Sequence, residues 1–189
     1  MVSEADLRGT NLKLVSILWT GSQASDEVMD GAMGKRNYLI EGVSGTGKTS
    51  VCTELQRRGY QAIDGDRELA DRGNPDRHKS PLWHVEKVQA LVANKDEAVT
   101  FFCGATRNFE KFIELFDGVF ILEVDLDTCL RRIDERVALD PTDWGGRPEE
   151  RELIARLHQT KEDLPKNGII IDATRPLERV VDEIVTVLK

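Results

Sequence analysis

The stretch Gly42-Val43-Ser44-Gly45-Thr46-Gly47-Lys48-Thr49 matches the pattern G-x-x-x-x-G-K-[ST] at every defined position. An apolar run, 38–40, precedes it, and a run with helical spacing, 48–58, follows it. In this strand–loop–helix context the pattern forms a loop that cradles phosphate groups. Its glycines let consecutive backbone N–H groups point at phosphate oxygens, and the following helix contributes its positive end. The stretch therefore predicts a nucleotide-binding loop.

The side chains of this loop have distinct expected roles. Lys48 is expected to reach the β- and γ-phosphates of ATP, and the Thr49 hydroxyl to ligate Mg²⁺. A guanine-reading N-K-x-D is not found, because Asn94-Lys95-Asp96-Glu97 ends in Glu and precedes its strand. We leave the preference between ATP and GTP open. The other expected nucleotide contacts in this region are Gly42, Ser44, Gly45, Thr46, Gly47 and Ser50.

Apolar strands alternate with helical segments along the rest of the chain. This alternation predicts an α/β fold of three layers, the P-loop NTPase fold, with a five-stranded parallel sheet covered by helices on both faces. Ligands bind such sheets at the carboxyl ends of the strands. The expected strands are 38–40, 60–63, 98–103, 119–124 and 168–171. The expected helices are 48–58, 82–93, 109–116, 126–137, 149–163 and 176–188.

Composition narrows the class of protein further. The chain has 189 residues, with 26 Lys and Arg against 34 Asp and Glu, a net charge of −8. This acidity disfavours nucleic-acid and membrane partners, and the three scattered cysteines form no zinc pattern. We expect a cytoplasmic protein, either a monomer or a homodimer. Residues 1–34 are expected to be an N-terminal extension, and 35–189 the α/β domain.

The nucleotide loop, the D-x-D sequence Asp64-Gly65-Asp66 and a late arginine-rich segment together resemble the nucleoside-monophosphate-kinase-like group. Shikimate, gluconate and adenylate kinases belong to this group of P-loop small-molecule kinases. The resemblance implies transfer of the γ-phosphate of ATP to a hydroxyl of a small-molecule acceptor, with Mg²⁺ and a short lid at about 137–148. By resemblance, Asp64 is assigned to the metal and Asp66 to the acceptor hydroxyl.

The arginines receive their roles from the same resemblance. Cys103-Gly104-Ala105-Thr106-Arg107 resembles C-S-A-L-K of gluconate kinase, which assigns Arg107 to the acceptor or the transferred phosphate. Arg132 and Arg136 are similar to the pair that precedes the adenylate kinase lid. They are assigned to the nucleotide and its phosphates, since guanidinium groups suit phosphate oxygens. Arg147 and Arg156 are similarly placed to lid arginines.

Other sequence features leave the acceptor open. The turn that contains Thr174 is expected to contact adenine, and the acceptor region lies between Arg67 and His84. Gly104-Ala105-Thr106 replaces the Gly-Gly-Gly of shikimate kinase, which argues against shikimate. Two alternatives stay open: a nucleoside or nucleoside-monophosphate kinase, and a nucleotide-binding regulatory module with weak ATPase activity.

Overall fold

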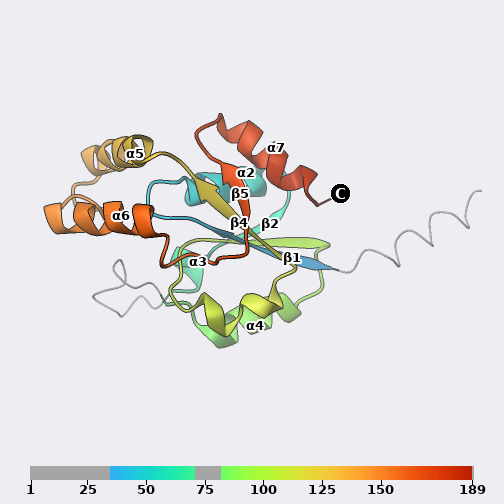
Figure 1. Cartoon of the computed structure of the whole chain (residues 1–189). Helices are drawn as coiled ribbons and strands as arrows, with labels where there is room; N and C mark the ends of the chain where they lie inside the picture. Colours follow the sequence, from blue (N-terminus) through green and yellow to red (C-terminus); the bar gives the residue numbers. More distant parts are fainter. Residues whose placement is uncertain (1–34, 71–81, 189) are drawn as a thin grey trace, which may run out of the picture. The chain divides into compact units, whose positions relative to one another are not determined.

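Five parallel strands form one sheet in the order β2-β3-β1-β4-β5 (Figure 1). The computed structural model describes residues 35–70 and 82–188. The predicted α/β fold is confirmed, whereas the predicted extension 1–34 lies outside the described residues. The strands are β1 (Arg36–Glu41), β2 (Gln61–Asp64), β3 (Val99–Cys103), β4 (Gly118–Glu123) and β5 (Ile169–Asp172).

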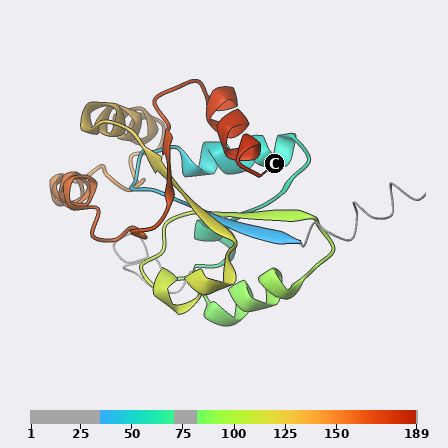
Figure 2. The same ribbon diagram turned by 45° about the vertical axis from the view of Figure 1, so that its right-hand side comes forward.

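Helices cover both faces of this sheet. Figures 1 and 2 show α2 and α7 on one face and α4 on the other. Within 35–70 and 82–188, no helix is both long and apolar enough to cross a membrane. The helices are α2 (Lys48–Arg57), α3 (Gly65–Glu68), α4 (Val85–Ala93), α5 (Leu126–Leu139), α6 (Pro148–Thr160) and α7 (Leu177–Thr186).

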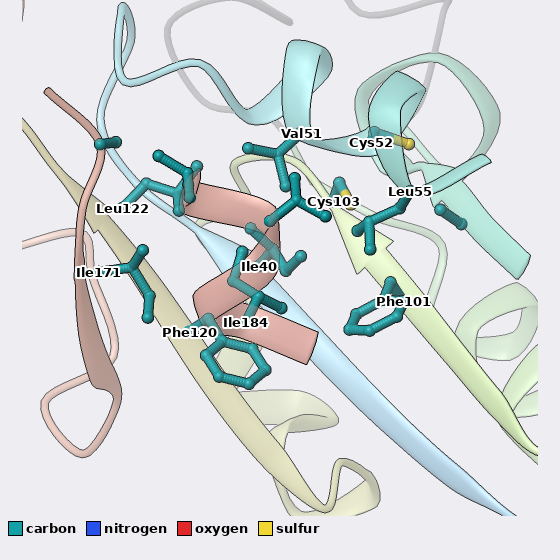
Figure 3. Close-up of a cluster of buried hydrophobic side chains, with 14 of the residues drawn as sticks. Ile40, Val51, Cys52, Leu55, Phe101, Cys103, Phe120, Leu122, Ile171 and Ile184 are labelled. Carbon is teal, nitrogen blue, oxygen red and sulfur yellow. The ribbon is translucent and has the colours of Figure 1, made fainter. Parts of the chain in front are cut away.

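Alternation along the strands builds a separate core on each face. On the α2 and α7 face, Ile40 and Phe120 pack with Leu55 and Ile184, and all four are fully buried (Figure 3). The neighbouring strand residue, Leu39, points to the opposite face, where it packs in a second cluster with α4. The apolar run 38–40 thus serves both cores, as expected for a central parallel strand.

The prediction of a helix over 109–116 is wrong. This segment forms two 3₁₀ turns, η1 (Phe109–Lys111) and η2 (Ile113–Leu115), separated by Phe112. The backbone of Phe112 has φ −148° and ψ 4°, outside the α-helical region. Its buried ring stacks on Trp83, with centroids 6.0 Å apart and planes 5° from parallel. Shorter hydrogen bonds, such as that from the N–H of Phe112 to the carbonyl of Phe109 at 3.0 Å, take the place of α-helical ones here.

The segment that joins α5 to α6 is shorter than the expected lid of 137–148. The helix α5 continues to Leu139, and the N–H of Asp140 still donates to the carbonyl of Arg136 at 3.0 Å. Pro148 then opens α6 at its first position, where a proline needs no N–H partner. The joining segment is therefore 140–147.

Truncation of a side chain should lower the free energy of unfolding much more at a buried core position than at an exposed one. Phe120→Ala removes a ring that is 0% exposed, so we expect a loss of about 3–5 kcal/mol in the free energy of unfolding. Leu139→Ala, at a side chain 89% exposed, should change it by less than about 0.5 kcal/mol. Urea unfolding followed by circular dichroism measures both. Equal losses in the two variants would contradict this core.

Candidate functional site

A cavity of about 890 Å³ opens at the carboxyl ends of the strands. Strand register brings these ends together, because Ile40 of β1 and Asp64 of β2 both pair with Cys103 of β3. The loops that follow β1, β3 and β5 all contribute to the cavity wall, together with α3 and the segments on either side of α6. This is where a parallel sheet is expected to bind ligands.

The loop 42–49 forms one wall of the cavity. Gly45 and Gly47 have φ of 86° and 99°, a region that favours glycine. The ammonium group of Lys48 donates to the carbonyls of Gly42 at 2.6 Å and Val43 at 3.0 Å. Lys48 also begins α2, so the positive end of this helix faces the cavity. Backbone and side chain together provide the chemistry that a polyphosphate requires.

Close packing around this loop leaves no room for side chains in place of two of its glycines, Gly42 and Gly45. A Cβ on Gly42 would lie 2.6 Å from the Thr46 hydroxyl, and one on Gly45 would lie 2.8 Å from the carbonyl of Cys129. Both distances are shorter than van der Waals contact allows, so the loop depends on these two glycines for its path. The sequence pattern assigns glycines in this loop to the orientation of backbone N–H groups, and close packing is an additional reason for Gly42 and Gly45.

Glu41 is a buried acid that sequence reasoning passed over. Its side chain is 1% exposed, and its two oxygens accept the N–H groups of Thr106 at 3.1 Å and Gly42 at 3.4 Å. Burial raises the pKa of Glu41 well above its ordinary value, although the nearby Lys48 opposes this shift. The available signal was a charged residue that closes an apolar strand directly before the nucleotide loop.

The two acids of the D-x-D sequence have separate positions. Asp66 lines the cavity, and its Oδ1 accepts the N–H of Ala105 at 3.0 Å. Burial raises the pKa of Asp66, and Lys48 opposes that rise. Asp64 instead caps α3, with its Oδ1 accepting the N–H of Arg67 at 3.3 Å, and it is not part of the cavity wall.

Arg132 contacts both the nucleotide loop and the turn after β5. One of its Nη atoms donates to the carbonyl of Ala173 at 2.9 Å, and the other lies 3.3 Å from the carbonyl of Thr46. The first carbonyl follows β5 and the second belongs to the nucleotide loop. Arg132 therefore lies between the expected adenine turn and the expected phosphate site.

Arg136 reaches the same loop one helical turn later. Its Nη2 lies 3.4 Å from the Ser44 hydroxyl and 2.5 Å from the carbonyl of Trp144. Its Nε forms an ion pair with Asp143, 3.0 Å from Oδ2. This guanidinium group thus connects the segment 140–147 to the nucleotide loop, which agrees with a position near phosphate.

The structure does not bring Arg147 into the cavity wall. Its Nε donates to Oε1 of Glu150 at 2.6 Å, while Oε2 of Glu150 accepts the N–H of Gly145 at 2.9 Å. Glu150 is 3% exposed, so it is a local partner that holds Arg147 at the start of α6. The phosphate role of Arg147 stays a prediction that the observed geometry does not support.

Arg156 and Thr174 also lie outside the cavity wall. Arg156 forms an exposed ion pair with Glu162 at 3.2 Å. The Thr174 hydroxyl donates to Oδ1 of Asp172 at 2.6 Å, which shapes the turn after β5. In that turn it is Arg175, a neighbour of Thr174, that lines the cavity. Both assignments to the nucleotide therefore stay predictions.

Arg107 and Asp163 also line the cavity. Burial raises the pKa of Asp163, and the nearby charges of Arg107 and Lys48 oppose the rise. Sequence reasoning placed Asp163 in a helix and gave it no role, whereas it follows the end of α6 at Thr160. Of the expected acceptor region, residues 71–81 lie outside the described residues.

Most predicted site residues do meet at this one cavity. Its donor set of backbone N–H groups, a lysine, arginines and the Thr49 hydroxyl suits ATP with Mg²⁺, which binds proteins mainly through phosphate oxygens and few side chains. Within 35–70 and 82–188, no group of three or more His, Cys, Asp or Glu could hold a metal by itself. The predicted residues in the wall are Gly42, Ser44, Gly45, Thr46, Gly47, Lys48, Thr49, Ser50, Asp66, Arg107, Arg132 and Arg136.

Solved structures with the same architecture include kinases. A gluconokinase from Sinorhizobium meliloti is 20% identical, with a TM-score of 0.57 over 82% of this chain and 92% of that chain. The chain has the P-loop kinase fold. A sugar kinase from Janibacter sp. is 21% identical, with a TM-score of 0.55 over 80% of this chain and 93% of that chain.

A third similar structure is the YorR protein of Bacillus subtilis in complex with phosphorylated GDP. It is 16% identical, with a TM-score of 0.51 over 80% of this chain and 95% of that chain. No family model and no curated protein matches the sequence. The similarity of this chain to known proteins is therefore one of fold, at low sequence identity.

Glu41 should impose a measurable pH dependence on stability. Its pKa is raised above the ordinary 4.5, so the folded protein holds this proton more tightly than the unfolded chain does. The stabilisation that this shift contributes is fully present below pH 4.5. It is lost as the pH rises through the raised pKa of Glu41 in the folded protein. The free energy of unfolding of the wild type should therefore fall relative to that of Glu41→Gln as pH increases.

Urea unfolding between about pH 4.5 and 9 measures this difference. Glu135→Gln, at a side chain 62% exposed, is the control and should run parallel to the wild type. A constant difference between Glu41→Gln and the wild type would contradict the assigned shift.

Proposed function

We propose that this protein transfers the γ-phosphate of ATP to a hydroxyl group of a small metabolite. The observation that carries the proposal is that Lys48 and Asp66 line the same cavity and are close enough to affect each other electrostatically. A phosphate-binding cation and a carboxylate thus converge where the nucleotide loop meets the loop after β3. Phosphoryl transfer needs such positioning and charge neutralisation more than covalent chemistry.

Each side chain has a specific part in the proposed reaction. The acceptor oxygen forms a bond to the γ-phosphorus while the bond from that phosphorus to the β–γ bridging oxygen breaks, which releases ADP. Asp66 orients the acceptor hydroxyl and receives its proton. Because desolvation in the cavity raises its pKa, the Asp66 carboxylate is a stronger base than an aspartate of ordinary pKa. Lys48 and Arg107 stabilise the charge on the transferred group.

The nucleotide is assigned to the opposite end of the cavity. We assign the phosphates to the loop 42–50 and to Arg136, and the base to the space beside Arg132 and the turn after β5. Mg²⁺ would be held by the Thr49 hydroxyl and would neutralise charge on the β- and γ-phosphates. The metal role of Asp64 stays a prediction, because its carboxylate caps α3 outside the cavity wall. All three cysteines are free, which supports a location in the reducing cytoplasm.

The direct test is ADP release with ATP and Mg²⁺ over a panel of polyols, sugar acids, nucleosides and nucleoside monophosphates. At least one acceptor should raise turnover well above the rate with ATP alone. Lys48→Ala should lower the stimulated rate by about a hundredfold or more, because it removes charge stabilisation in the transition state. The exposed Lys87→Ala on α4 is the control. ATP binding without any stimulation would instead favour a regulatory nucleotide-binding module.

Asp66→Asn tests the proposed base separately from nucleotide binding. The amide keeps the shape of the side chain but cannot take the proton, so kcat should fall by about a hundredfold or more. The KM for ATP should change little, since Asp66 is assigned to the acceptor. Steady-state kinetics with both substrates varied give these constants. If kcat stays within threefold of the wild type, Asp66 is not the base.

A further inference from the structure

The cavity contains a carboxylate that the proposed reaction does not use. Asp163 lines the wall, and its Oδ1 is buried with no hydrogen-bond partner among residues 35–70 and 82–188. Buried polar atoms in proteins nearly always have a partner, and an unsatisfied carboxylate oxygen costs free energy. A donor supplied by a bound ligand would satisfy this oxygen.

The segment around Asp163 is fixed on both sides. Lys161 ends α6 in a left-handed conformation with φ 53°, and its N–H donates to the carbonyl of Leu157 at 2.9 Å. Leu164 is buried, and its N–H donates to the carbonyl of Lys161 at 3.1 Å. Just before this turn, Nε2 of His158 lies 2.7 Å from the carbonyl of Val124. Asp163 is therefore held at a defined position in the wall.

Asp163 lines the same cavity as Asp66 but comes from a different segment of the chain. Asp66 follows β2, whereas Asp163 lies in the segment between α6 and β5. Both carboxylates nevertheless lie close enough to Lys48 to feel its charge. An acceptor that contacts both carboxylates would meet Asp66 with its reacting hydroxyl and Asp163 with a different group.

We propose that Asp163 binds the acceptor, with its Oδ1 accepting a hydrogen bond from a second hydroxyl that is not phosphorylated. This inference rests on the proposed function and specifies its substrate class: an acceptor with at least two hydroxyl donors. Asp163 then determines specificity, because an acceptor without the second donor leaves the buried oxygen unsatisfied. It takes no proton in the reaction, a role assigned to Asp66.

The test compares Asp163→Asn with the wild type, using D-gluconate, ribitol, glycerol and adenosine as probes. The KM for the acceptor that the wild type uses should rise about tenfold or more, as expected for loss of a hydrogen bond to a charged group. The KM for ATP should stay within twofold. Thermal stability should be unchanged or higher, because the substitution removes a buried charge. Glu152→Gln, an exposed position on α6, should leave all these values unchanged.

An acceptor analogue that lacks one hydroxyl sharpens the test. The analogue without the contacted hydroxyl should bind the wild type poorly but lose little more in Asp163→Asn, so the two changes are not additive. The inference is overturned if the KM for the acceptor changes by less than twofold, or if the KM for ATP rises in parallel. If the wild type binds ATP but phosphorylates no probe, the proposed function fails and this inference fails with it.

Discussion

The two hydrogen bonds accepted by the Glu41 carboxylate are the contact on which the cavity depends. They connect the first N–H of the nucleotide loop, at Gly42, to the N–H of Thr106 in the loop after β3. Because Glu41 is buried, loss of either bond would leave an unsatisfied group with no water to replace it. The carboxylate thus sets the relative position of Lys48 and Arg107, which belong to these two loops. Phosphoryl transfer depends on that kind of fixed geometry.

The distance in sequence between interacting groups decided what could be predicted. The nucleotide loop and the five strands were predictable because their patterns are local. Glu41 was not, because its partner Thr106 is 65 residues away. The spacing of apolar residues from Phe109 to Phe116 is typical of an α-helix. The buried ring of Phe112 instead stacks on Trp83, and no local pattern contains that information.

Competition for partners explains why Arg136, just before the predicted lid, and Arg147, near its end, behave differently. Arg147 has Glu150 one helical turn away, and this buried acid also binds the N–H of Gly145. A local partner at such short separation holds the guanidinium group at the start of α6. Arg136 instead extends across to Ser44 and to the carbonyl of Trp144, so it shares its donors between the joining segment and the nucleotide loop. A count of arginines alone could not separate these cases.

Charged side chains are distributed unevenly around the cavity. Arg132 and Arg136 lie along α5 beside the nucleotide loop, whereas Glu41, Asp66 and Asp163 all surround Lys48. A polyphosphate is therefore attracted toward the two arginines beside the nucleotide loop. Neutral hydroxyl donors suit the acids near Lys48, since they can satisfy carboxylate oxygens without adding negative charge. The transferred phosphate would then sit at the boundary, where Lys48 is the cation shared by both ends.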